Sequence, residues 1–126
     1  MKPTKLLFLS AATAVFLLAG SREARAQDPA VVNAKTIKVR FENDRVRVLE
    51  ATLAPGEKEQ MHSHPAYVVY VLAGGTIRLH GADGKTSDLT LETGDVMYRE
   101  PVVQHWGENI GTTATRLILV ELKDDR

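Results

Sequence analysis

The chain has 126 residues and a formal net charge of zero, with 16 Lys and Arg against 16 Asp and Glu. A chain of this length is expected to form a single domain. It contains no cysteine, which excludes disulfide scaffolds, thiolate metal sites and cysteine nucleophiles.

The first 26 residues have the features of a secretory signal peptide. Lys2 and Lys5 form a basic start, and residues 6–20 are apolar apart from two hydroxyl residues. Ala24-Arg25-Ala26 then offers small residues at the two positions that a signal peptidase reads. The apolar run of about 15 residues is short for a transmembrane span. We therefore expect residues 1–26 to be cleaved after Ala26 and the mature protein to be periplasmic or secreted, a retained anchor being the alternative.

The mature chain would be mildly acidic. Removal of residues 1–26 takes away four basic residues and one acidic residue, which leaves 12 basic and 15 acidic residues and a net charge of −3. This charge is unfavourable for binding nucleic acid. We expect neither a nucleic-acid partner nor a membrane partner for the mature form.

After a lead-in over residues 27–35, the pattern is that of short strands separated by turns. The strands are predicted over residues 35–41, 45–48, 67–72, 76–80, 89–91 and 116–122. Turn residues recur about every 8–12 positions, and no segment of the mature chain shows the period of a long amphipathic helix. Residues 36–126 are therefore predicted to form one all-β domain, an antiparallel β-barrel of jelly-roll type.

Two histidines stand two residues apart, as His62-Ser63-His64. On a β-strand such residues point to the same face, so both imidazoles would project together. Imidazole is a ligand for zinc, iron, copper and nickel. The pattern points to a metal site, with a pair of exposed strand histidines as the alternative.

These histidines belong to two motifs that resemble those of the cupin superfamily. Gly56, His62-x-His64 and Gly75 are similar to its first motif, and the second is matched by Gly94-Asp95, Pro101, His105 and Asn109. Residues 61–75 and 119–123 further resemble short stand-alone bacterial cupins. The resemblance implies that His62, His64 and His105 bind a divalent transition metal, which could be Fe, Mn, Zn, Cu or Ni.

One ligand of the family pattern is missing. The usual glutamate would fall near Val68, or at Tyr67 if one residue has been deleted, and neither is acidic. Three neutral imidazoles leave the full +2 charge on a divalent ion, which favours an anionic ligand or a metal-bound hydroxide. A barrel whose histidines only line a polar cavity is the alternative.

Several polar and aromatic residues are candidates for the pocket. Gln60 is expected to share the inward face of His62, as a weak fourth ligand or a hydrogen-bond donor, or else to be an ordinary strand residue. Tyr70 and Tyr98 are candidates for hydroxyls that reach the pocket, or for core aromatics. Trp106 is expected to cover the barrel mouth or a dimer contact.

Three further titratable residues are expected at the surface. Glu57 and Glu59 lie next to the turn that precedes the histidine pair, where solvated side chains are common. His80 stands at the end of a hairpin strand. None of the three is assigned to the site.

The resulting hypothesis is a small exported metallo-cupin with a small anionic ligand. The resemblance implies oxygen-dependent cleavage or isomerisation of a small organic acid, with catalytic residues not identified. A non-catalytic ligand-binding module and a structural dimer with a vestigial pocket are the alternatives, because one fold hosts many functions. We expect a homodimer, since edge strands such as residues 37–41 need covering.

Overall fold

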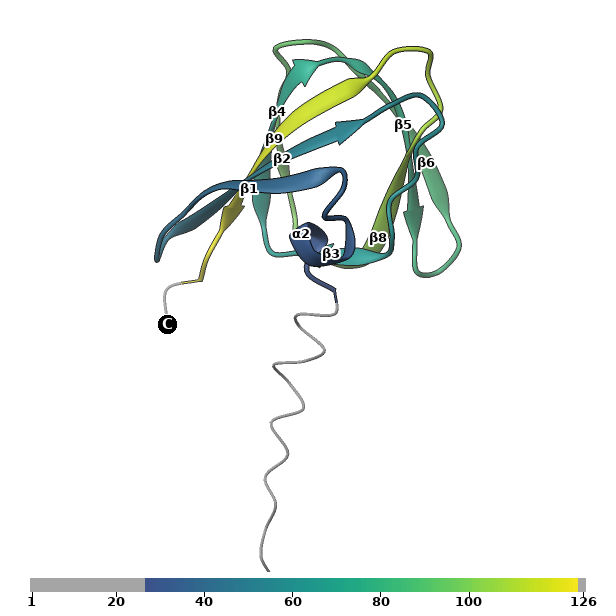
Figure 1. Cartoon of the computed structure of the whole chain (residues 1–126). Helices are drawn as coiled ribbons and strands as arrows, with labels where there is room; N and C mark the ends of the chain where they lie inside the picture. Colours follow the sequence, from purple (N-terminus) through teal and green to yellow (C-terminus); the bar gives the residue numbers. More distant parts are fainter. Residues whose placement is uncertain (1–26, 125–126) are drawn as a thin grey trace, which may run out of the picture.

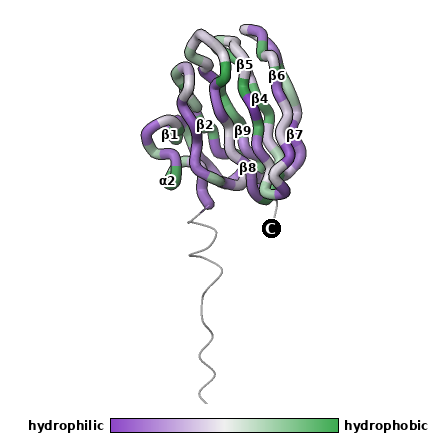
Figure 2. Tube along the Cα trace, turned by 90° about the vertical axis from the view of Figure 1, so that its right-hand side faces the viewer, coloured by the Kyte–Doolittle hydropathy of each residue, from purple (hydrophilic) through white to green (hydrophobic). Residues whose placement is uncertain are grey.

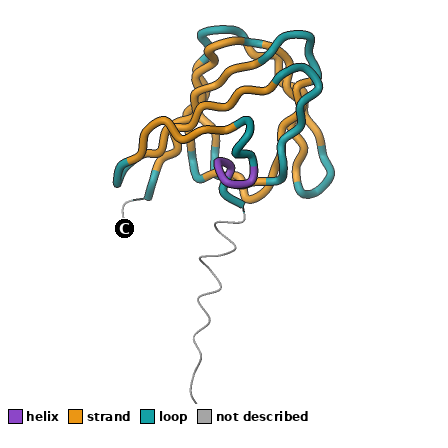
Figure 3. Tube along the Cα trace, in the orientation of Figure 1, coloured by secondary structure: helices purple, strands orange, loops and turns teal. Residues whose placement is uncertain are grey.

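The computed structural model describes residues 27–124, so the predicted signal peptide lies outside the described residues. Figure 3 shows that this part of the chain consists of strands, loops and a single short helix. Within these residues, no helix is long and apolar enough to cross a bilayer. In chain order the elements are α2 (Pro29–Val32), β1 (Ile37–Glu42), β2 (Val46–Leu53), β3 (His62–His64), β4 (Tyr67–Ala73), β5 (Gly75–Gly81), β6 (Thr86–Leu91), β7 (Val96–Arg99), β8 (Val102–Asn109) and β9 (Thr115–Leu122).

The strands form two antiparallel sheets that face each other. The five-stranded sheet has the order β1-β2-β9-β4-β7, and the four-stranded sheet has the order β3-β8-β5-β6. In Figure 1 they enclose the interior of a short barrel, with α2 beneath it beside β3. The all-β prediction is confirmed, and the barrel is a double-stranded β-helix built from two antiparallel sheets.

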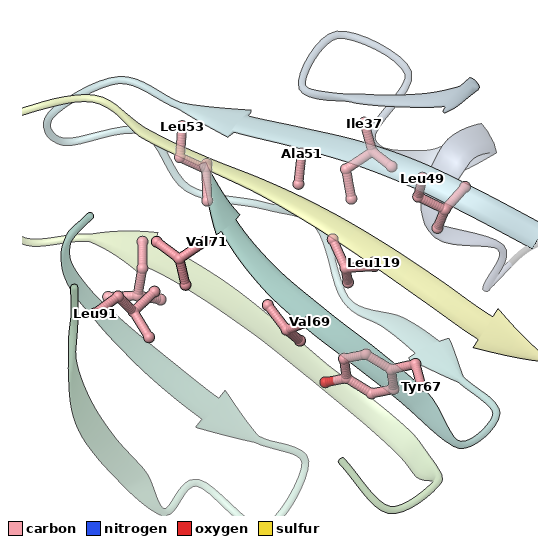
Figure 4. Packing of buried hydrophobic residues seen from close by; sticks show 10 residues of the cluster. Ile37, Leu49, Ala51, Leu53, Tyr67, Val69, Val71, Leu91 and Leu119 are labelled. Atoms are coloured by element: carbon pink, nitrogen blue, oxygen red, sulfur yellow. The ribbon is translucent and has the colours of Figure 1, made fainter. Parts of the chain in front are cut away.

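The apolar core lies between the sheets and follows the alternation of the strands. On β2 the inward residues are Leu49, Ala51 and Leu53, while β4 contributes Val69 and Val71. Figure 4 shows these side chains meeting in the space between the sheets. Each fully buried Leu or Val contributes roughly 1.5–3 kcal/mol to folding. Because inward and outward residues alternate, hydrophobic and hydrophilic positions are mixed along each strand (Figure 2).

Three residues of the sequence motifs hold turns and loops. Gly56 and Gly94 have φ angles of 81° and 94°, a region that strongly favours glycine. Asn109 is buried, and its side-chain amide donates to the carbonyls of Leu53 and Thr113, both at 2.8 Å. The motif asparagine therefore joins two loops at one end of the barrel.

The lead-in before the first strand contains a short helix. Asp28 accepts a hydrogen bond from the Ala30 N–H at 2.9 Å and caps α2, whose first residue is Pro29. Such a cap followed by proline is a favourable helix start. The segment packs on β1 and β3, and Asn33, which follows the helix, lies beside His62.

Candidate metal centre

Two adjacent strands bring the three predicted ligands together. His62 and His64 lie on β3, and His105 lies on β8, where it is the direct partner of His62 in the antiparallel register. His62 and His64 are both buried, while Ser63 between them faces the other way, its N–H donating to the Gln27 carbonyl at 3.0 Å. The expected alternation of the His-x-His pair is thus present.

The three imidazoles form a compact buried cluster. The His62 ring centroid is 4.8 Å from that of His64 and 4.8 Å from that of His105, and His64 and His105 are 5.3 Å apart. One ring nitrogen from each lies within 4.8 Å of the others. The residues are 1%, 5% and 8% exposed, in sequence order. This arrangement is consistent with a metal site.

The Nδ1 atom of His62 is held by the segment that precedes β3. It lies 2.8 Å from the Gln60 carbonyl oxygen, to which a protonated Nδ1 donates. Asn33 braces that carbonyl, because its Nδ2 donates to the Gln60 oxygen at 3.1 Å and its Oδ1 accepts from the Gln60 N–H at 2.6 Å. With Nδ1 protonated, the lone pair of Nε2 is free for a metal.

His64 is held by a chain of charged groups. Its Nδ1 lies 2.7 Å from Glu121 Oε1, and Glu121 Oε2 accepts from Arg47 Nε at 2.7 Å. Arg47 in turn donates to Asp28 Oδ2 at 2.6 Å. Burial alone would raise the pKa of Glu121, but the bonds to His64 and Arg47 hold it below its usual value. A carboxylate bound to the second nitrogen of a histidine is the common support for a metal ligand.

His62 and His105 are neutral in the metal-free protein near neutral pH. Burial lowers the pKa of His62 to about 4. Burial, together with the neighbouring His62 and His64, lowers that of His105 to about 3. Neutral imidazole is the form that binds metal ions. The donor set therefore fits a divalent transition metal.

Glu59 corrects an expectation from the sequence, because its side chain is buried in the cavity rather than solvated. It is 9% exposed, and its Oε2 lies 3.9 Å from His62 Nε2. Burial raises the pKa of Glu59 to about 7, although the N–H of Gly107 donates to the carboxylate. Glu57, two residues earlier, does lie near the surface, where it pairs with Lys35 at 3.2 Å.

A cavity of about 80 Å³ lies beside the cluster, bounded by the three histidines, Glu59, Tyr67 and the apolar core. A second pocket of about 390 Å³ shares Tyr67, Arg99 and His105 with it. Burial raises the pKa of the Tyr67 hydroxyl, while the charge and a hydrogen bond of Arg99 oppose the rise. The guanidinium of Arg99 therefore lies where the cavity and the outer pocket meet.

The strand alternation separates the remaining candidates. Tyr67 faces inward and its ring lies 4.7 Å from that of His64, whereas Val68 and Tyr70 do not line the cavity. Tyr98 is 56% exposed and lines only the outer pocket. Gln60 is exposed, so its main chain rather than its side chain serves His62.

Trp106 lies on the outer face of β8, away from the cavity. Its ring stacks on that of His80, with centroids 3.6 Å apart and planes at 4°. His80 also lies 3.1 Å from Glu108 through its Nε2. His80 is thus partly covered, and this pair forms no part of the cluster.

Sequence reasoning missed the residues that support or surround the histidines. Asn33 and Asp28 belong to the lead-in, and Arg47 and Glu121 lie on predicted strands but 74 residues apart. Only the β2–β9 register, in which Arg47 is the partner of Glu121, brings the pair together. The strand pattern alone carries no signal for that register.

Comparison with known proteins agrees with this fold. Residues 49–121 match the family model of the cupin domain. The chain belongs to the cupin family. No curated protein matches it.

Solved cupin structures share the fold. A cupin domain from Bordetella pertussis Tohama I is similar at 28% identity and a TM-score of 0.64, covering 70% of this chain and 92% of that one. A cupin from Methanocaldococcus jannaschii with a double-stranded β-helix fold has 16% identity and a TM-score of 0.58, with coverages of 69% and 78%. An uncharacterised protein from Klebsiella pneumoniae with a double-stranded β-helix domain has 23% identity and a TM-score of 0.56, with coverages of 68% and 73%.

Proposed function

We propose that this cupin binds one divalent transition metal ion through a ring nitrogen of each of His62, His64 and His105. The observation that carries the proposal is the buried cluster of three imidazoles, from each of which one ring nitrogen lies within 4.8 Å of the others. Two of the rings have their second nitrogen engaged by Gln60 and Glu121. These contacts fix the two rings and leave their other nitrogens for the metal.

The second part of the proposal is a small anionic ligand, such as an organic acid. Arg99 stands between the outer pocket and the cavity and would attract and orient a carboxylate. The apolar walls around the cluster exclude water from the bound ligand. A bound metal supplies Lewis-acid or redox chemistry, which fits an oxygenase or isomerase. Capture of the same ligand without a reaction is the alternative.

The test is the metal content of the mature protein, purified without added metal and measured by elemental mass spectrometry. We expect about one Fe, Mn, Zn, Cu or Ni per chain in the wild type, and its loss in His62→Ala. A wild type that holds no metal and takes up none on reconstitution contradicts the proposal. Oxygen uptake with a panel of small organic acids then separates an oxygenase from a binding protein.

The proposed location is outside the cytoplasm, on the strength of the pattern in residues 1–26. Expression in a bacterial host and fractionation of the periplasm test it. The intact mass of the exported protein should correspond to a chain that begins at Gln27. An uncleaved chain in the membrane fraction would support the retained anchor instead.

A further inference from the structure

Two hydrogen bonds join Glu59 to β8, the strand that carries His105. The Glu59 N–H donates to the Gly107 carbonyl at 2.9 Å, and the Gly107 N–H donates to Glu59 Oε2 at 2.9 Å. Glu59 lies between β2 and β3, so this pair of bonds crosses to β8 and holds the side chain beside the cluster. The carboxylate is thus placed by β8 and by the backbone of Glu59 itself.

Gly107 leaves the space that this carboxylate fills. A Cβ atom at position 107 would lie 2.9 Å from Glu59 Oε2, closer than real Cβ contacts. Any other residue at this position would push the carboxylate out of its place. The glycine therefore allows a close approach between an acidic side chain and the β8 backbone.

Glu59 has no cationic partner of its own. Within residues 27–124, no Lys or Arg nitrogen lies within 4.0 Å of its carboxylate, and the only basic group there is His62 Nε2. The other buried acid of the site differs, because Glu121 is paired with Arg47 at 2.7 Å. A buried carboxylate without a counter-charge is unfavourable unless a cation occupies the neighbouring space.

The distance between Glu59 and His62 fits a shared ion after a small movement. Metal–nitrogen and metal–oxygen bonds of about 2.1 Å place two donors of one ion about 3–3.5 Å apart. The two atoms now lie 3.9 Å apart, so a shift of less than about 1 Å brings both to one ion.

We propose that Glu59 is the fourth protein ligand of the metal centre, an assignment that rests on the proposed metal function. The carboxylate reaches the cluster from the segment before the histidine pair. At the position after the pair, the inward-facing residue of this chain is Tyr67. Three neutral imidazoles and one carboxylate reduce the charge of a divalent ion from +2 to +1. Such a mixed nitrogen and oxygen donor set favours Fe²⁺, Mn²⁺ or Co²⁺ over Cu⁺.

The experiment is a titration of the metal-free protein with Co²⁺, whose visible absorption reports its ligands. We compare the wild type with Glu59→Gln, which keeps the size of the side chain and removes its charge. Removal of a supporting group weakens metal binding about 10–100-fold, and we expect loss of a direct ligand to weaken Co²⁺ binding by roughly 100-fold or more. The absorption bands should also change in position and intensity. Glu57→Gln is the matched control and should leave both the affinity and the spectrum unchanged.

Wild-type affinity and an unchanged spectrum in Glu59→Gln would overturn the assignment while leaving the three-histidine site intact. If the wild type does not bind Co²⁺, or if His105→Ala binds Co²⁺ as tightly as the wild type, the proposed function and the assignment are overturned together. If Glu59→Gln does not fold by circular dichroism, Glu59→Asp takes its place, because it keeps the charge but withdraws the carboxylate by one methylene. An unchanged Co²⁺ spectrum in that variant likewise overturns the assignment.

Discussion

His64 depends on Glu121 for the orientation of its ring. Glu121 binds His64 Nδ1 on one side and Arg47 on the other, each at 2.7 Å. Burial would lower the pKa of Arg47, yet the bonds to Asp28 and Glu121 raise it, so the guanidinium stays charged and fixes the carboxylate. The orientation of a metal ligand is therefore set through two buried ionic contacts.

We predict that Glu121→Gln weakens metal binding by about 10–100-fold, the range for loss of a group that orients a ligand. Glutamine can still accept a bond from Nδ1 but does not balance Arg47. The measurement is a metal titration well below the unfolding temperature. Glu50→Gln is the control, because Glu50 pairs with Arg40 and Arg116 on the outer face of β2. Equal affinities in the two variants would contradict the role given to Glu121.

The lowered pKa values of His62 and His105 predict acid sensitivity of the metal-free protein. Both groups bind protons near pH 6.5 when unfolded, but only near pH 4 and pH 3 when folded. The unfolded chain thus holds more protons in this window, so the contribution of these two histidines to stability is full above pH 6.5 and is lost as the pH drops. Each histidine contributes a slope of up to about 1.4 kcal/mol per pH unit.

Chemical denaturation at several pH values, without metal, measures this slope. Glu59 acts in the opposite direction, because its raised pKa lowers stability as the pH rises from 4.5 to about 7. His105→Asn retains Glu59 and should lose less stability than the wild type between pH 6.5 and pH 4. Equal losses in the two proteins would show that His105 does not titrate as its burial implies.

At this scale the sequence motifs predicted the histidine cluster but not its surroundings. His62, His64 and His105 were found because their spacing is local and matches a family pattern. Glu59 was misplaced because it follows a turn, where side chains are commonly solvated, and only its bonds to Gly107 bury it. Contacts between distant strands decide such residues, and no short motif contains them.

At the scale of elements, the segment before β1 supports the site through contacts with β3, Gln60 and Arg47. Residues 27–33 reach β3 through the Gln27 carbonyl, and Asn33 holds the Gln60 carbonyl that accepts from His62. The same segment supplies Asp28 to Arg47 at 2.6 Å. Figure 1 shows α2 beside β3 at the lower end of the barrel. Two of the three histidines are therefore supported from one short segment.

We predict that Asn33→Ala lowers both stability and metal affinity. The substitution leaves the Gln60 N–H without its partner and frees the carbonyl that holds His62. Loss of such a buried bond costs about 1–3 kcal/mol, and the affinity should fall by about tenfold or more. Thermal unfolding and a metal titration measure the two effects. Val31→Ala, at a residue of α2 that is 59% exposed, should change neither, and a similar loss there would argue for a general role of the helix.

The elements that the sequence pattern missed are those nearest the site. Strands at residues 37–42, 67–73 and 115–122 agree with prediction to within two residues, because runs or alternations of apolar residues mark all three. β8 was not recognised, since its buried inward residues are His105, Gly107 and Asn109. Polar and small residues at inward positions remove the apolar alternation that marks a strand. The apolar alternation therefore fails to predict β8, the strand that carries His105.

At the scale of the molecule, the outer face of the five-stranded sheet carries a continuous apolar row. Successive register pairs join Phe41, Val48, Val120, Val68 and Tyr98 across all five strands. Phe41 is 53% exposed and Tyr98 is 56% exposed. A second row beside it contains Ile118, Tyr70 and Val96. Contiguous exposed apolar surface of this kind marks an interaction site.

We expect this face to join two copies of the chain, rather than the edge strand suggested by the sequence. A self-complementary apolar face is suited to a twofold dimer, in which the same surface is used twice. Sedimentation equilibrium of the wild type should give a dimer. Val68→Lys places a charge in the middle of the row and should weaken association at least about tenfold, because burying an unpaired ammonium in an apolar interface is unfavourable. Val103→Lys is the control, since Val103 is 81% exposed on β8 of the other sheet, and it should remain dimeric. A monomeric wild type, or equal association of the two variants, would mean that another partner or none covers the row.

The metal content of Val68→Lys shows whether the site needs the second copy. Because the histidines, Glu59 and Glu121 all come from one chain, we expect the monomer to bind metal as the dimer does.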